Sequence, residues 1–579
     1  MRKEILIKTR TAHRMDRAAF TLPEMLVAVG LMLLVMSLFA EIFSLAVTAM
    51  TTQVGLAKND QRARTAFIVI DNDLKRMSYR AIDGQQGIVP LVPGLRYKGE
   101  EAAPEQQGYI YYSENNPLDD TDDVLQFTIF GQQQNNRYPE QNLDYYGRAS
   151  NIPTGPAGNR RDQPDWDDGT PGDGVSVSKQ AEVVYFLRHG TLYRRTLLLR
   201  DATAIPNNLQ EFDGSDEQKR AQPAVFSGGD PIDLMIAYGG NFYSDFDYSA
   251  HFGTSPYDAD LSTPPGSPNR VALFHSSLSN TATNNWPLGV PHFRFGFSAY
   301  KDPSNPPTIS DGRPREYFAS GRVDYFFGRY THEETSNVNF QYPDNNSSNV
   351  FTRNDFDLTI YQNTGRLDVF ANGPRRGTDI LMNNVQSFDV EIWDERASRF
   401  VDIGSTELVG QDFSTVKNLN PNYGPIKPNR TGPLASNPDE VNVFDTWHSL
   451  TTTQLTSLNA TIVGTGQAPY VPKVTNPASV GTWTPGPYTV GTLVKPTTPG
   501  RINNAILYRC TIPGTAVTEP SWNTDVTVGE FVDGDGIGWQ IIDNRRPIKA
   551  LRIIIRFHDP NSDQMRQVTI VHSFNENLE

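Results

Sequence analysis

The stretch Phe20-Thr21-Leu22-Pro23-Glu24, followed by the apolar run of residues 25–50 (MLVAVGLMLLVMSLFAEIFSLAVTAM), decides the fold of this chain. A run of this length can form a helix that crosses a bilayer, because about 20 apolar residues at 1.5 Å per residue span the hydrocarbon core. The run opens on a carboxylate, Glu24, and a charge close to the bilayer core is costly and usually functional. We therefore expect a membrane-spanning helix with a functional acid at its start.

The residues around this acid resemble a processing motif. The order Phe-Thr-Leu-Pro-Glu directly before an apolar run is similar to the cleavage and methylation motif of type IV pilins and type II secretion pseudopilins. The resemblance implies that a prepilin peptidase cuts between Ala19 and Phe20 and methylates the new terminal amine. Ala19 stands where the family usually has glycine. The resemblance also implies that the Glu24 carboxylate pairs with the Phe20 amine of a neighbouring subunit during filament assembly.

An amine and a carboxylate that both lie in lipid are tolerable only when they are paired, so this pairing lets subunits recognise one another. Two other interpretations stay open. The run can be an ordinary signal anchor with an incidental acid, or a signal peptide cleaved after Ser44-Leu45-Ala46, which would release a soluble protein. Glu41, further along the run, is expected as an interfacial charge or as a second assembly contact.

Charge and composition indicate where the chain lies. Residues 1–19 are rich in Lys and Arg, and a basic flank stays in the cytoplasm. We expect a single-pass inner-membrane protein whose N-terminus is cytoplasmic before processing and whose head lies in the periplasm. The whole chain has 579 residues and a net charge of −15, which excludes a nucleic-acid partner. Cys510 is its one cysteine, so no internal disulfide can form.

A second, amphipathic helix is predicted over residues 58–82. Its apolar residues recur three or four positions apart, which is the period of one helix face. No proline occurs between Glu24 and Arg80, so the two helices are expected to form one continuous helix whose second half packs on a globular head. Residues 70–76 further resemble the end of the long helix in the minor pseudopilin J family. The predicted apolar face consists of Ala63, Phe67, Ile70, Leu74, Met77 and Ala81.

The remaining chain reads as β-strands between turn-rich insertions. Residues 124–130 predict a strand, and residues 181–187 and 191–199 predict a hairpin that turns at Gly190. Residues 379–393, 548–557 and 567–572 are expected as further strands of the head. The order of these strands is similar to that of the pseudopilin J family. The predicted fold is α+β: a long N-terminal helix, half transmembrane and half amphipathic, packed on an antiparallel, pilin-like β-sheet head with large loop and β insertions.

One insertion, residues 481–543, reads as a compact module of its own. Its aromatic and glycine order resembles small β-modules related to family 5 and 12 carbohydrate-binding modules. Exposed aromatic rings can stack on sugar faces, which makes carbohydrate a candidate ligand. The alternative is that the rings form the core of a miniature β-fold, as is more usual for any one Trp. The candidate rings are Trp483, Tyr488, Trp522 and Trp539.

No sequence motif indicates catalysis. The chain lacks a Gly-rich phosphate loop, an HExxH metal motif, a GxSxG elbow and Cys-based metal spacing, so we expect a protein that is not an enzyme and needs no cofactor. Acidic turns offer the hard oxygen ligands that calcium prefers, and solvated turns without metal are the alternative. The first-ranked calcium candidates are Asp165, Asp167, Asp168 and Asp173.

These patterns predict a structural protein, a minor pseudopilin or minor pilin of a type II secretion system or a related machine. Its expected partners are the prepilin peptidase, other pilins or pseudopilins, and the inner-membrane assembly platform. The alternative is a membrane-anchored carbohydrate-binding protein of the periplasm or cell surface that uses a pilin-like anchor. The predicted parts are a leader (1–19), a transmembrane helix half (20–50), an amphipathic helix half (51–82), the first part of the head (83–201), an insertion (202–378), head strands (379–403), a linker-like insertion (404–480), the β-module (481–543) and the C-terminal head strands (544–579).

Overall fold

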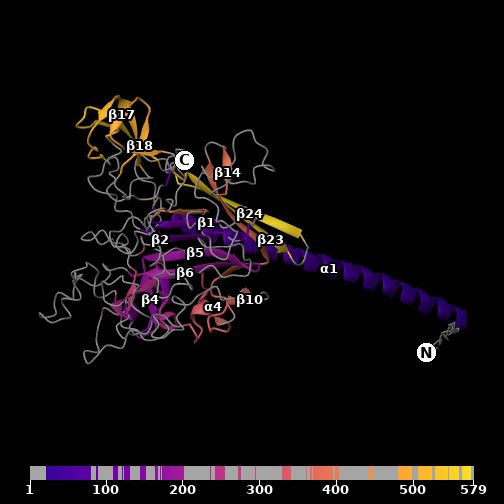
Figure 1. Ribbon diagram of the computed structural model, residues 1–579. Coiled ribbons are helices and arrows are strands. Elements are labelled where there is room, and N and C mark those ends of the chain that lie inside the picture. The colour runs from indigo at the N-terminus through magenta and orange to yellow at the C-terminus, as the bar shows by residue number, and fades with distance from the viewer. Residues whose placement is uncertain are drawn as a thin grey trace, which may run out of the picture. The chain divides into compact units, whose positions relative to one another are not determined.

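The computed structural model describes a long N-terminal helix and a set of mostly antiparallel β-sheets (Figure 1). The chain divides into two compact units, Met1–Gln61 with Asp559–Gln564, and Arg62–His558 with Met565–Glu579. The described residues are 21–79, 87–88, 108–114, 120–121, 123–130, 144–150, 164–166, 168, 170, 172–200, 235–236, 242–253, 271–275, 288, 294, 329–340, 360–361, 366–367, 370–394, 398–402, 442–446, 480–497, 506–523, 528–544, 547–559 and 564–574.

Helix α1 (Leu22–Lys75) is one unbroken helix of 54 residues, as the lack of internal proline predicted. Pro23 lies in the first turn, where the missing amide hydrogen is not needed. Every side chain from residue 22 to residue 51 is exposed. The most apolar window of α1 has a mean hydropathy of 2.5 and none of it is buried, so the helix is long and apolar enough to cross a membrane.

The last turns of α1 pack on the head through a stripe of residues four positions apart. Ala66, Ile70 and Leu74 are each at most 2% exposed. The prediction for Phe67 was wrong, because its side chain is 38% exposed and Ala66, the next position round the helix, faces the core instead. The helix also ends earlier than predicted. Met77 lies beyond it and bridges to Ile129, while Ala81 lies outside the described residues.

A six-stranded antiparallel sheet forms one part of the head. Strand β2 (Val124–Phe130) and the hairpin of β5 (Gln180–Arg188) and β6 (Thr191–Leu199) confirm the predicted strands. The two turn residues of that hairpin, His189 and Gly190, have φ of 43° and 74°, the left-handed values that suit a two-residue hairpin turn. The strand order is β12-β6-β5-β2-β1-β15, with β12 (Ile380–Asn383), β1 (Ile110–Glu114) and β15 (Asn442–Asp445).

A four-stranded antiparallel sheet joins segments far apart in the sequence. Its order is β14-β13-β23-β24, so strands from all three of the later predicted segments lie next to one another. One expectation needs correction: residues 379–393 are two strands in different sheets, because Asn384 adopts a left-handed φ of 60° between β12 and β13. Asparagine tolerates that conformation better than most residues. The bounds are β13 (Val385–Asp394), β14 (Arg399–Val401), β23 (Ala550–Asp559) and β24 (Gln564–Ser573).

Short elements complete the head, and several of them lie in the insertion at residues 202–378. Strand β3 (Tyr145–Arg148) pairs with β4 (Val175–Ser178), and a one-turn helix η1 (Pro164–Trp166) precedes β4. The insertion contains β7 (Met235–Ile236), β8 (Ala250–Gly253), β9 (Val271–Phe274), β10 (Ile360–Tyr361), β11 (Arg366–Leu367) and two short helices, α3 (Phe242–Asp245) and α4 (His332–Thr335).

Residues 481–543, here called the β-unit, pair only with one another among the described strands. A five-stranded sheet has the order β16-β18-β19-β22-β21, and β17 pairs with β20. Cys510 lies on β19 and is fully buried. The bounds are β16 (Gly481–Thr482), β17 (Gly486–Tyr488), β18 (Leu493–Lys495), β19 (Ile506–Ile512), β20 (Gly514–Ala516), β21 (Glu530–Val532) and β22 (Gly538–Asp543).

Candidate functional site

The start of α1 carries an exposed carboxylate in a fixed position. Thr21 directly precedes the helix, and Glu24 lies three residues after Thr21. At this spacing the Glu24 side chain can fold back over the first turn. The Thr21 amide donates to Glu24 Oε2 at 2.9 Å, and the Thr21 hydroxyl donates to the same oxygen at 2.8 Å. Among the described residues the other oxygen, Oε1, has no hydrogen bond. Glu24 therefore stabilises its own helix and keeps one oxygen for a further partner.

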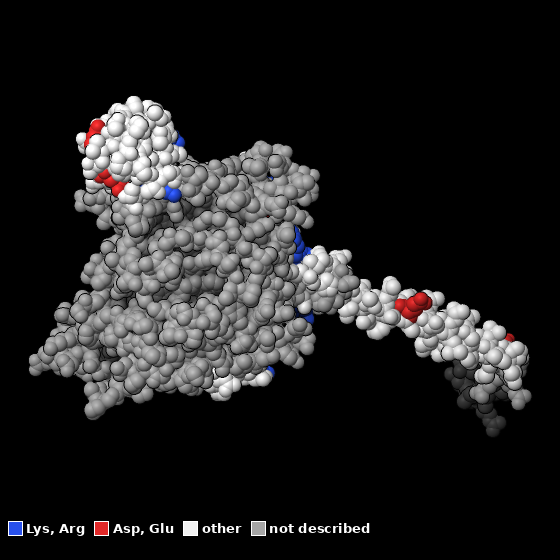
Figure 2. All heavy atoms as spheres, in the orientation of Figure 1, with Lys and Arg blue, Asp and Glu red and all other residues white. Residues whose placement is uncertain are grey.

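An apolar surface surrounds this carboxylate. In the space-filling view the exposed helix is white apart from isolated red patches (Figure 2). Glu24 and Glu41 are the acids of this stretch, and neither Lys nor Arg occurs in it before Lys58. The hydroxyls of Thr48 and Thr52 donate to backbone carbonyls one turn earlier, at 2.8 and 2.9 Å, which satisfies them within the helix. Ala19 and Phe20, the predicted cleavage site, lie outside the described residues.

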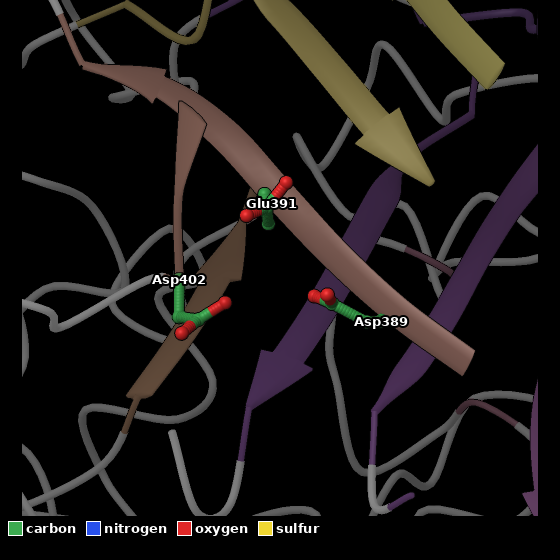
Figure 3. Close-up of side chains that lie close together, drawn as sticks. All are labelled: Asp389, Glu391 and Asp402. Carbon is green, nitrogen blue, oxygen red and sulfur yellow. The ribbon is translucent and has the colours of Figure 1, made fainter. Parts of the chain in front are cut away.

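A second group of acids lies on the four-stranded sheet and was missed by the sequence analysis. Asp389 and Glu391 alternate along β13, so both project from one face, while Phe388 and Val390 are buried on the other. Asp402 follows β14 directly. One carboxylate oxygen from each of the three acids lies within 4.8 Å of the other two (Figure 3). The alternation Asp-Val-Glu was the available signal in the sequence.

Acids outnumber arginines around this group. Arg552 on β23 lies opposite Glu391 on β13. It donates to the Glu391 carboxylate through Nε and through Nη2, the latter at 2.6 Å. Burial, then the negative charges of Glu391 and Asp120, raise the pKa of Asp389 to about 7. Burial and the charges of Asp389, Glu391 and Asp120 raise the pKa of Asp402 to about 8. Three acids that repel one another in this way can bind a cation or share protons.

The predicted calcium ligands that the structure describes accept hydrogen bonds from backbone amides. Asp165, only 1% exposed, accepts hydrogen bonds from the amides of Gly172 and Gly174. Asp168 accepts from the Thr170 amide at 2.8 Å, and Asp173 accepts from the Val175 amide at 2.9 Å. These carboxylates hold the turn before β4, and those of the described residues do not come together into a set of three around one point. Asp167 lies outside the described residues.

The candidate sugar-stacking rings mostly form the core of the β-unit. Trp539 is fully buried, and Trp483 and Tyr488 are 5% and 8% exposed. The Trp539 ring meets those of Tyr488 and Trp522 edge-on, at centroid distances of 5.2 and 5.3 Å. In this structure none of these three rings presents a free face to a sugar, and all three belong to the miniature core that was the alternative interpretation. Trp522 is partly buried, and the centroid of its ring lies 4.3 Å from that of Tyr508.

The charged groups of a buried polar cluster around α4 link segments that lie far apart in the sequence. Glu334 and Thr331 form a capping box, and the Glu334 carboxylate also accepts from Arg188 at 2.7 and 3.0 Å. The His332 amide donates to Asp379, whose pKa burial raises to about 7. Burial and the nearby Arg195 lower the pKa of the His332 imidazole well below its usual value. These contacts tie the insertion at residues 202–378 to the hairpin of β5 and β6.

Three comparisons with known proteins, against protein-family models, curated proteins and solved structures, found no match to this chain.

Proposed function

We propose that this chain is a structural subunit of a pilin-like assembly, a minor pseudopilin or minor pilin, that acts without catalysing a reaction. The single observation that carries the proposal is the start of α1, where an exposed carboxylate is held at the beginning of an exposed apolar helix. A helix surface this apolar requires either lipid or other helices around it.

The pairing step follows from the geometry of Glu24. In lipid a lone carboxylate is costly, and its own Thr21 satisfies only one of its two oxygens. A terminal amine at Phe20 of a neighbouring subunit would neutralise the charge and donate to the free oxygen. In this proposal the peptidase creates that amine by cutting after Ala19, with the N-terminus in the cytoplasm and the head in the periplasm.

The rest of the proposal is a pilin-like head. The last turns of α1 pack on an antiparallel sheet, which supports that fold. The carbohydrate-binding alternative loses its main support because three of its four rings are buried, and no other observation favours it.

The test compares Glu24→Gln with Glu41→Gln in the full-length chain, co-expressed with the prepilin peptidase and the pilin-like subunits of its host. Glutamine keeps the acceptor that bonds to Thr21 and removes only the charge. Breaking one half of a buried pair costs about 3–5 kcal/mol, so capture of partner subunits should fall about a hundredfold or more for Glu24→Gln. Glu41→Gln removes an equal charge from the same helix and should keep capture.

Two further readouts complete the experiment. Both variants should fractionate with the membrane, because losing a charge eases insertion. Intact mass should place the mature terminus at Phe20 with one added methyl group. Capture at the wild-type level by both variants would show that Glu24 does not carry assembly, and a mature terminus between residues 46 and 51 would contradict the pilin-like assignment itself.

A further inference from the structure

The group formed by Asp389, Glu391 and Asp402, here called the acidic site, has a feature that an ordinary acidic surface lacks. Asp389 is 8% exposed, and its carboxylate has no hydrogen bond with any described residue, although the charges of Arg556 and Arg552 act on it from a distance. Its side chain points toward Asp402 across the space below Glu391 (Figure 3). Buried polar groups are almost always satisfied by a partner, by water or by an ion, so this carboxylate calls for one.

The nearby cations do not fill that need. Arg552 is paired with Glu391, and Arg556 is paired with Asp120 at 2.7 Å. These two pairs leave the carboxylates of Asp389 and Asp402 without an ion-pair partner among the described residues. Asp389 and Asp402 together carry two negative charges when both are deprotonated. One divalent cation would balance this charge, which Arg552 and Arg556 offset only in part.

The oxygens lie close enough together for one cation to contact all three. The three ligand oxygens lie within 4.8 Å of one another. Calcium accepts carboxylate oxygens in flexible geometry and completes its shell with water, whereas magnesium demands a near-ideal octahedron, so an irregular set of carboxylates favours calcium. Each oxygen of Glu391 has a second lone pair, so it can serve the cation while it accepts from Arg552.

We propose that Asp389, Glu391 and Asp402 bind a hard divalent cation of calcium size, which fastens the end of β14 to β13. Asp389 and Asp402 supply the two free carboxylates and Glu391 supplies a shared oxygen. Water fills the remaining positions, as is usual for calcium sites with few protein ligands. Binding at this site is independent of the assembly role of α1.

The experiment uses the full-length chain in detergent, stripped with EDTA and titrated with calcium chloride by calorimetry, with magnesium chloride as a parallel arm. We expect one saturable calcium site with a dissociation constant of about 0.01–1 mM, the range of extracellular calcium modules and weak sensors, and weaker binding of magnesium. Saturating calcium should also raise Tm by a few degrees, because a ligand that binds only the folded state stabilises it.

Three variants make the result specific. Asp389→Asn and Asp402→Asn should each lose the calcium-dependent rise in Tm, while Tm in EDTA stays equal or rises, because a repelling charge is removed. A variant that simply failed to fold would instead lower Tm in EDTA. Asp168→Asn, which removes a carboxylate from the turn before β4, is the matched control and should keep full binding.

Each other outcome overturns the proposal. Absence of saturable calcium binding by the wild type, together with a raised Tm of both variants in EDTA, would mean that the acids share protons and hold no metal. Loss of binding in Asp168→Asn with retention in Asp402→Asn would move the calcium to the turn that contains Asp165. Should Asp389→Asn prove unstable, Asp402→Asn decides alone, because Asp402 lies beyond the end of β14 and is only partly buried.

Discussion

Asp73, in the last turn of α1, joins the helix to the six-stranded sheet. Its carboxylate accepts from Arg194 Nε at 2.7 Å and from Arg194 Nη2 at 3.0 Å, the two-point geometry that makes such pairs strong. The Tyr185 hydroxyl donates to the same carboxylate. Burial, then the adjacent Asp73 charge, raise the pKa of Tyr185 well above its usual value, so the phenol remains a donor. Asp73 is thus a buried acceptor for side chains of both β5 and β6.

We predict that Asp73→Asn lowers the free energy of unfolding by about 3–5 kcal/mol, because it leaves the Arg194 charge without its partner. Asp71→Asn is the matched control on the same turn. Asp71 pairs with Lys75 at the surface, and an exposed pair of this spacing contributes about 0.3–0.5 kcal/mol. Urea denaturation of both variants measures the difference, and equal losses would mean that the buried pair contributes little.

His572, on β24, makes the stability depend on pH. Burial lowers the pKa of its imidazole to about 4, from an ordinary 6.5, although Asp71 opposes the shift. Between these two pH values the unfolded chain binds a proton that the folded chain does not. The free energy of unfolding should therefore fall as pH drops from about 6.5 to about 4, by at most about 3 kcal/mol. His572→Gln should remove this part of the slope, and parallel curves for variant and wild type in denaturation series would contradict the prediction.

At the scale of elements, local pattern predicted most of what the chain forms. The 54-residue helix followed from an apolar run without internal proline, and β2, β5 and β6 followed from short runs rich in strand-forming residues and bounded by turns. The burial of Phe67 was predicted wrongly because the buried face of a helix can include either of two adjacent positions. Packing on the sheet decides which of the two is buried. The break at Asn384 is a single backbone conformation that no periodicity reveals.

The acidic site shows why sites are harder to predict than elements. Asp389 and Glu391 share a strand, and their common face is readable from the alternation. Asp402 joins them only because the register of β13 with β14 places Ile392 opposite Val401. The arginines come from β23, more than a hundred residues away, and their pairing follows from tertiary contacts that a single sequence does not contain. The Glu24 site was readable because it is local to one turn.

The bridge between Ile88 and Ile548 depends on one glycine. Gly87 has φ of +115°, and a Cβ there would lie 2.4 Å from the carbonyl oxygen of Ile548. That oxygen also accepts from the Ile88 amide at 2.9 Å, so it cannot move away without losing the bridge.

We predict that Gly87→Ala destabilises the chain by about 1–2 kcal/mol through backbone strain. The clash with Ile548 adds about 1–3 kcal/mol. Gly172→Ala isolates the first contribution, because Gly172 also has a positive φ, +84°, but has nothing within 4 Å of the added atom. Thermal denaturation of the two variants measures the difference. Equal losses would show that the backbone around Ile548 yields to the methyl group.

At the scale of the whole molecule, the β-unit is the part most separate in its hydrogen bonding. All of its described strands pair within it, and its aromatic residues pack on one another. The nine predicted segments of the chain remain a prediction. The two compact units of the structure divide the chain differently, within α1 after Gln61.

We predict that a fragment of residues 480–544 folds alone with a cooperative thermal transition. Trp539→Ala should abolish that transition, because losing a buried Trp costs about 3–5 kcal/mol, most of what a unit of this size has. Circular dichroism and near-ultraviolet fluorescence of the two fragments provide the measurement. A wild-type fragment without a cooperative transition would mean that the β-unit needs the head in order to fold.

The burial of Cys510 has a practical consequence for chemical labelling. It is the one cysteine of the chain, and burial raises the pKa of its thiol, so little reactive thiolate is present at neutral pH. A cysteine introduced on the exposed surface of α1, for example at Leu26 or Leu33, would then be the one thiol that reacts with a maleimide or forms a disulfide with another copy. The natural chain therefore contributes little background reaction to such experiments. Single introduced cysteines can then map, residue by residue, which helix faces meet inside a membrane.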